Sequence, residues 1–137
     1  MADYDRPLPK PDPVTKPFWD SVKEHAIKIQ RGKTSGRYVF YPRAMMPGDL
    51  EEELEWVSVS GRGTLFAFSI PHRHANRAFG SRAPYVVALV ELEEGARMLA
   101  NLVDVEPTPE AVKIGMPLEI VYDDVTEEIT LPRFKPR

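Results

Sequence analysis

Cysteine is absent from the 137 residues of this chain. Its absence excludes disulfides, thiolate nucleophiles and thiolate metal ligands. Also missing is any apolar run near the ~20 residues that a membrane-spanning helix requires. The opening residues MADYDRPLPKPDP lack the basic and then apolar order of a secretory signal. We therefore expect a cytoplasmic protein that has no membrane partner.

An excess of positive charge is missing as well. Eighteen Lys and Arg residues stand against 21 Asp and Glu residues, which gives a net charge of −3. A chain with this balance has no overall field that would draw it to nucleic acid. Its length fits one domain, or one domain with a small appendage, and its 42% hydrophobic and 28% charged residues are typical of a soluble globular protein.

The N-terminal region combines a proline-rich arm with a short helix. Proline lacks a backbone donor and fixes φ, so residues 1–14, rich in proline, are predicted to be extended. This arm is either a disordered terminus or a segment that packs along a partner. From Thr15, a predicted cap, apolar residues recur at spacings of three and four, which predicts an amphipathic helix over about 16–26.

The rest of the sequence is typical of β-strands. Short runs alternate apolar with polar or small residues and are separated by turn-forming residues. Little helix accompanies them, which favours a small antiparallel barrel. The predicted strands are Lys28–Gln30, Tyr38–Tyr41, Glu55–Val59, Gly63–Ile70, Tyr85–Leu92, Met98–Val103, Leu118–Asp123 and a short last one near Ile129–Leu131.

Four pieces of this sequence, taken in order, resemble the OB-fold domain of DUF35 proteins. They are WVSVSGRGTLFAF at 56–68, PYVVALVEL at 84–92, NLV at 101–103 and IGMPLEI at 114–120. The resemblance implies a mainly β protein: an N-terminal helix, a rubredoxin-like ribbon hairpin and an OB-fold antiparallel β-barrel. We accordingly divide the chain into an arm (1–14), a helix with a ribbon-like hairpin (15–50) and a barrel with a C-terminal tail (51–137).

The resemblance also implies a zinc site that this sequence does not preserve. DUF35 ribbons usually carry two Cys-x-x-Cys knuckles, with a Pro-Arg pair shortly before the second, and here Pro42 and Arg43 supply that pair. The four ligand positions fall on Gly32, Ser35, Met46 and Asp49. Glycine has no ligand atom, and serine and a thioether are poor ligands for zinc. We predict a ribbon without metal, held by apolar side chains, with Met45 and Met46 filling the space of the cluster.

No catalytic constellation emerges from the residue pattern. The sequence lacks a Gly-x-Ser-x-Gly elbow, and its three histidines are His25, on the predicted helix, and His72 and His74, in a polar segment. Nucleophilic catalysis needs a nucleophile, a base and a group that orients the base. The acidic runs at 49–55 and 91–94 are interpreted as solvated faces.

The most informative polar segment is residues 72–82, which contain three arginines and no acid. The segment joins two apolar strands and is expected to project from one rim of the barrel. Arginine suits the phosphates of coenzyme A, or carboxylates across a protein interface. The binding candidates are Arg73, His74, Arg77, Phe79 and Arg82. A mobile, solvated loop is the alternative.

Function is inferred from the family resemblance, because DUF35 proteins accompany acyl-CoA thiolases and thiolase-like aldolases. The resemblance implies a non-catalytic accessory subunit that forms a hetero-oligomer with a thiolase-like enzyme and helps to shape an acyl-CoA site. A stand-alone carrier of coenzyme A thioesters is the second hypothesis, and a small independent enzyme remains open. An OB-fold nucleic-acid binder is disfavoured, because the negative charge opposes it and Phe66, Phe68, Tyr85 and Tyr122 are expected in the core.

Overall fold

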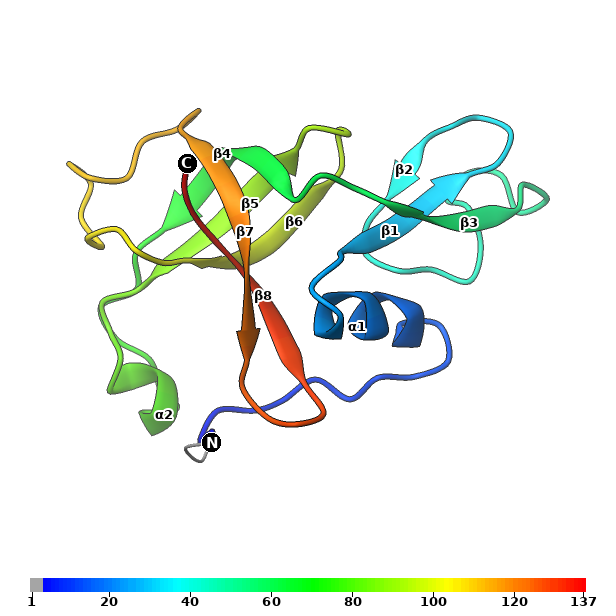
Figure 1. Ribbon diagram of the computed structural model, residues 1–137. Coiled ribbons are helices and arrows are strands. Elements are labelled where there is room, and N and C mark those ends of the chain that lie inside the picture. The colour runs from blue at the N-terminus through cyan, green and yellow to red at the C-terminus, as the bar shows by residue number, and fades with distance from the viewer. Residues whose placement is uncertain (1–3) are drawn as a thin grey trace.

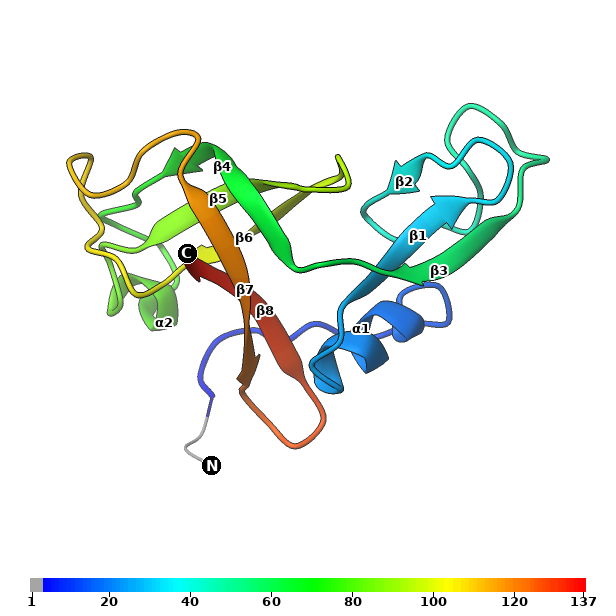
Figure 2. The ribbon, with the colours of Figure 1, turned by 45° about the horizontal axis from the view of Figure 1, so that its top comes forward.

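A helix, a small three-stranded sheet and a closed barrel follow one another along the chain (Figure 1). The computed structural model describes residues 4–137. Helix α1 (Lys16–Lys23) precedes a sheet with strand order β2-β1-β3, and in Figures 1 and 2 this sheet lies beside the barrel with α1 beneath it. The strands of the sheet, which we call the ribbon sheet, are β1 (Lys28–Gly32), β2 (Tyr38–Val39) and β3 (Leu54–Ser58).

Five strands close the barrel in the order β4-β5-β6-β8-β7. All neighbours are antiparallel except β6 and β8, which meet in parallel at Leu102 and Phe134. A five-stranded Greek-key barrel is the OB fold, so the predicted mainly β fold class is confirmed. The strands are β4 (Arg62–Ser69), β5 (Val86–Leu92), β6 (Arg97–Leu102), β7 (Pro117–Asp124) and β8 (Thr130–Pro136).

One hydrophobic core joins the helix, the ribbon sheet and the barrel. Strand β5 alternates strictly, with Val86, Ala88, Val90 and Leu92 buried, as a strand with one face toward a core should. The buried Phe18 and Val22 of α1 and Ile27 and Ile29 before and within β1 belong to the same cluster. The ribbon sheet is therefore fixed to the barrel by shared apolar contacts.

Helix α1 begins at Lys16, as the sequence predicts, but its capping contact and its end differ from the prediction. Thr15 is the N-cap residue, but its side chain makes no capping hydrogen bond. Asp12 organises the turn instead, because its Oδ1 accepts from the amides of Val14 (2.9 Å) and Thr15 (2.8 Å). The helix ends at Lys23, three residues early, and His25 adopts a left-handed φ of 59°, a conformation that commonly follows a helix end.

Two further differences concern the barrel. The C-terminal residues, expected to form a short strand near Ile129–Leu131 followed by a tail, form one strand, β8, which runs from Thr130 to Pro136. Pro132 pairs with Tyr122 of β7, and on its other side β8 meets β6 only at Phe134, so the missing proline donor costs little there. Phe66, expected in the core, is 43% exposed and lies under the guanidinium of Arg97, 3.7 Å from it.

No helix within residues 4–137 is long and apolar enough to cross a membrane.

The barrel strands approach too closely at Gly63 to leave room for a side chain. Gly63 pairs with Leu92 of β5 and Leu118 of β7, and a Cβ there would collide with the backbone carbonyl of Glu91. We predict that Gly63→Ala lowers the free energy of unfolding by about 2 kcal/mol or more in urea denaturation. Thr64→Ala, at the exposed neighbouring position, should change it by less than about 0.5 kcal/mol. Equal effects of the two variants would contradict this reading.

Candidate functional site

An apolar cleft of about 360 Å³ lies between α1, the loop after β2, and strands β6 and β8. The aromatic side chains of Phe18, Trp19, Phe40 and Tyr41 pack against one another at its edge, with successive ring centroids 4.4–5.3 Å apart. The barrel contributes Leu99, Ala100, Leu131 and Pro132. Tyr41 and Leu99 remain 50% and 55% exposed.

Beside this cleft lies a buried polar network that sequence analysis did not identify. Arg133 is only 8% exposed. Its Nε donates to Asp123 Oδ2 (2.7 Å) and its Nη1 to Asn101 Oδ1 (2.9 Å). The Asn101 amide donates in turn to the carbonyl of Val86 (3.1 Å). Because a buried charge needs a partner and hydrogen bonds, this network fixes one wall of the cleft.

The apolar surface continues from the cleft onto the loop of the ribbon. An open groove of about 540 Å³ shares Thr15 and Pro42 with the cleft. It adds Met45 and Leu50, which are 54% and 74% exposed. We call the cleft and the groove together the apolar face. Contiguous exposed apolar surface of this kind marks interaction sites.

The resemblance implies zinc ligands at Gly32, Ser35, Met46 and Asp49, and protein side chains pack closely at these positions. Met46 is buried, whereas Met45, which was expected to fill the same space, is 54% exposed. A Cβ at Gly32 would collide with the Met46 methyl group and with the carboxylate of Glu52. A ribbon without metal stays a prediction.

The Glu52 carboxylate holds the turn that follows β1. Its Oε1 accepts hydrogen bonds from the backbone amides of Ser35 (2.6 Å) and Thr34 (3.1 Å). These bonds, led by that from Ser35, hold the pKa of the Glu52 carboxyl below its usual value. Sequence analysis interpreted residues 49–55 as a solvated face. This interpretation was wrong at Glu52 and at Glu55, which are partly buried, and Glu55 pairs with Arg31 (2.8 Å). It holds at Glu53, whose side chain pairs with Lys33 (2.8 Å) but stays 75% exposed.

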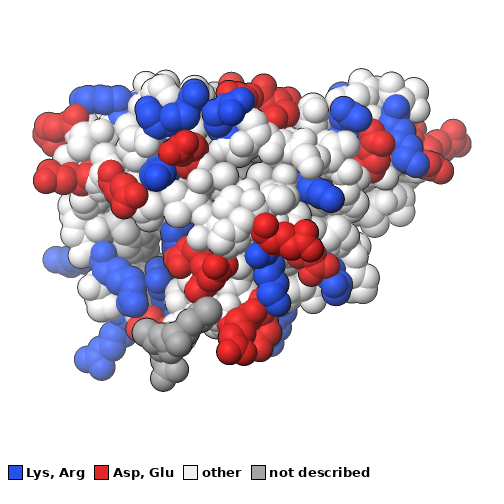
Figure 3. All heavy atoms as spheres, viewed as in Figure 1, with Lys and Arg blue, Asp and Glu red and all other residues white. Residues whose placement is uncertain are grey.

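The segment 72–82 contains a short helix, α2 (Arg77–Gly80), at one end of the barrel. The Asn76 side chain caps it by accepting from the Ala78 amide, and His74 Nδ1 accepts from the Asn76 amide (both 2.9 Å). Figure 3 shows Lys and Arg side chains gathered at the lower left, the region of α2 in Figure 1.

The five binding candidates of this segment do not converge on one site. Phe79 and Arg82 line a cavity of about 270 Å³. Arg73, His74 and Arg77 line none of the three cavities described here.

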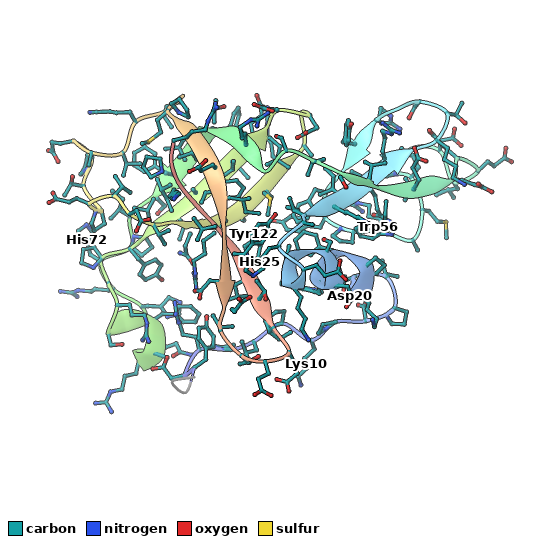
Figure 4. The ribbon with its side chains drawn as sticks, in the orientation of Figure 1. Lys10, Asp20, His25, Trp56, His72 and Tyr122 are labelled. Atoms are coloured by element: carbon teal, nitrogen blue, oxygen red, sulfur yellow. The ribbon has the colours of Figure 1, made fainter. Side chains whose placement is uncertain are left out.

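His25 and His74 are held by structural contacts. His25 Nε2 lies 2.9 Å from Asp124 Oδ1, and its ring stacks on Tyr122 with centroids 4.9 Å apart. Figure 4 shows these two rings next to each other at the centre of the molecule, far from His72. Tyr122 in turn accepts from the Ile27 amide (2.9 Å), so the set ties the chain after α1 to β7. Within residues 4–137, no three His, Asp or Glu side chains are placed to hold a metal ion.

Comparison with known proteins supports the fold and the family. A family model described as "ChsH2, C-terminal OB-fold domain" matches residues 56–123. The chain is 38% identical to a DUF35 domain-containing scaffold protein of Methanocaldococcus jannaschii, over 80% of this chain and 77% of that protein. It is 42% identical to the 3-oxo-4,17-pregnadiene-20-carboxyl-CoA hydratase alpha subunit of Mycobacterium tuberculosis, over 78% of this chain and 33% of that protein. The chain thus spans about a third of the length of the curated hydratase subunits that it matches.

Among solved structures, a chain of the Ltp2-ChsH2(DUF35) aldolase is similar over almost the whole length. The two superpose with a TM-score of 0.81 at 30% sequence identity, covering 94% of this chain and 98% of that one. The likeness therefore includes the helix and the ribbon sheet as well as the barrel.

The role of Glu52 can be tested by hydrogen exchange. We predict that Glu52→Ala speeds exchange of the Thr34 and Ser35 amides roughly fivefold, because each loses its acceptor. Glu51→Ala changes an exposed neighbour and should leave these rates unchanged. Because the folded-state pKa of Glu52 is lowered, its contribution is present above the ordinary pKa of a glutamate. That contribution should be lost as pH falls through the lowered value. Equal protection in both variants would contradict the assignment.

A second prediction concerns the effect of zinc on stability, which we expect to be absent if the ribbon sheet binds no metal. Excess zinc or a chelator should leave the thermal midpoint of unfolding unchanged within about 1 °C, because a ligand stabilises only a fold that binds it. Elemental analysis of the purified protein provides the direct check. Zinc at one equivalent per chain would overturn the prediction of a metal-free ribbon.

Proposed function

This chain belongs to the DUF35 family, and from that premise we propose that it is a non-catalytic accessory subunit of a thiolase-like acyl-CoA enzyme. The observation that carries the proposal is the likeness, over nearly both chains, to a component of the Ltp2-ChsH2(DUF35) aldolase. Relatives of similar length are named as scaffold proteins. In this proposal the partner supplies the catalytic residues, and this chain stabilises it and helps to form the acyl-CoA site. We expect the complex in the cytoplasm.

The apolar face is the part of the surface that best fits an enzyme partner. Tyr41 and Leu99, from the ribbon loop and from β6, expose about half of their surface on either side of the cleft. Met45 and Leu50 extend this surface along the ribbon. Apolar side chains at the centre of an interface contribute most to binding, because they are fully desolvated on association. We therefore place the docking site of the thiolase-like subunit on the apolar face.

The cleft also gives the accessory subunit a way to shape an acyl-CoA site. Its volume of about 360 Å³ falls within the roughly 300–1,000 Å³ of most ligand pockets, and its walls are mainly apolar. A partner seated over the open side would enclose it. An acyl group held there would lie between the two subunits, which accounts for a role in substrate binding without catalytic residues in this chain.

A stand-alone carrier of coenzyme A thioesters is the second candidate, and the size of the cleft favours it. The two candidates differ in what the isolated chain binds. A carrier binds the thioester alone, with the acyl group in the cleft. A subunit binds it weakly alone and gains a complete site only with its partner.

Copurification tests the accessory role. We predict that the tagged chain, co-expressed with a thiolase-fold enzyme encoded in the same genome, retains that enzyme on an affinity resin. Leu99→Asp should reduce retention at least tenfold, because a charge is buried in the apolar face. Ile114→Asp is the matched control, since Ile114 is 61% exposed but lines none of the described cavities.

Two results would contradict the proposal. One is sustained turnover of acyl-CoA substrates by the isolated chain, abolished by a substitution within it. The other is retention of the enzyme that both variants reduce equally, which would place the docking site elsewhere than on the apolar face.

A further inference from the structure

The third cavity, of about 270 Å³, lies where the N-terminal arm meets α2 and the barrel. Three guanidinium groups from distant parts of the sequence line it: Arg6 from the arm, Arg82 after α2, and Arg133 from β8. Two aromatic rings, Phe79 and Tyr85, and one carboxylate, Asp123, also line it. We call this cavity the arginine pocket.

The three arginines differ in how their charge is balanced. Arg133 is paired with Asp123 and hydrogen-bonded to Asn101. Arg82 donates to the carbonyl of Ala78 (3.1 Å) and lies 3.3 Å from Asp5, with both side chains about half exposed. Arg6 has no carboxylate partner among residues 4–137. The pocket therefore keeps an unbalanced positive charge.

Arg6 also presents a buried donor without an acceptor. Its Nε is shielded from solvent and makes no hydrogen bond to any residue from 4 to 137. Its guanidinium is held by aromatic rings instead, 4.6 Å from the centroid of Tyr4 and 6.0 Å from that of Phe79. A buried donor left unpaired is rare in native structures and calls for an explanation. An anion in the pocket would supply the missing acceptor.

The size and lining of the pocket restrict what that anion is. At about 270 Å³ it is smaller than most ligand pockets, so it accommodates little more than one ring with its charged group. Guanidinium groups match the planar oxygens of carboxylates and phosphates. The rings of Phe79 and Tyr85 offer apolar surface to a flat group beside them.

We propose that the arginine pocket binds an oxyanion, a phosphate or a carboxylate, carried on a single flat ring. Arg6 donates to the anion, Arg82 adds a second positive charge, and Phe79 and Tyr85 pack against the ring. The pocket gives the proline-rich arm a role, because the arm contributes Arg6, the one arginine of the pocket lining that has no carboxylate partner among residues 4–137. This proposal does not depend on the docking of an enzyme partner.

Titration of the full-length protein, monitored by amide chemical shifts at low salt, tests the proposal. The probes are phenyl phosphate, benzoate and the neutral benzamide, so that charge and ring are separated and the two oxyanions are compared. We expect one or both oxyanions to bind and to shift the signals of Asn101 and Tyr85, and benzamide to bind at least tenfold more weakly. Arg6→Ala should weaken binding of the oxyanion at least about tenfold. Arg77→Ala, an exposed arginine outside the pocket, should not.

Each other outcome overturns the proposal. Equal losses in the two variants would indicate non-specific attraction to the basic rim. Equal binding of benzamide would show that the anion is not recognised. Absence of binding of both oxyanions at concentrations up to 10 mM would show that the pocket does not bind this class of ligand. A Kd of 10 mM corresponds to a binding free energy of about −2.7 kcal/mol.

Discussion

Closure of the barrel depends on β8, which pairs along its length with β7 and meets β6 in one parallel step at Leu102 and Phe134. Phe134 is completely buried, and its carbonyl accepts the Val103 amide at 2.7 Å. The same strand places Leu131 and Pro132 in the apolar cleft and Arg133 between the cleft and the arginine pocket. Because α1 packs on β8 as well, the position of the ribbon sheet beside the barrel also follows from this strand.

The ribbon sheet is held together by contacts among its own side chains and backbone. The buried Met46 packs against Gly32, and the Glu52 carboxylate accepts hydrogen bonds from the amides of Thr34 and Ser35. Ile27 and Ile29 attach the sheet to the shared hydrophobic core, and Val39 is buried within the sheet. A ribbon held in this way still presents the loop from Tyr41 to Leu50 at a defined place.

The two surfaces proposed for binding lie on either side of one polar network. Asn101 and Arg133 line both the apolar cleft and the arginine pocket. Arg133 is buried and hydrogen-bonded to Asp123. It therefore separates the apolar cleft, which suits a protein partner or an acyl group, from the cationic arginine pocket. Ligand in the pocket and partner on the apolar face would thus contact the same two side chains.

The class of fold and much of the barrel could be predicted from the residue pattern alone, because alternation of apolar and polar residues is a local property that a strand such as 86–92 carries in full. The sequence also showed that no cysteine stands at the four positions where the resemblance implies zinc ligands, since residue types at fixed spacing are readable without coordinates. It did not reveal that Glu52 accepts the amides of the turn after β1, that Phe66 faces outward, or that the prolines at 132 and 136 belong to a barrel strand. Nor could it bring Arg6, Arg82 and Arg133 to one pocket. Those outcomes were decided by tertiary structure, because each depends on which residues distant in sequence the closed barrel brings into contact.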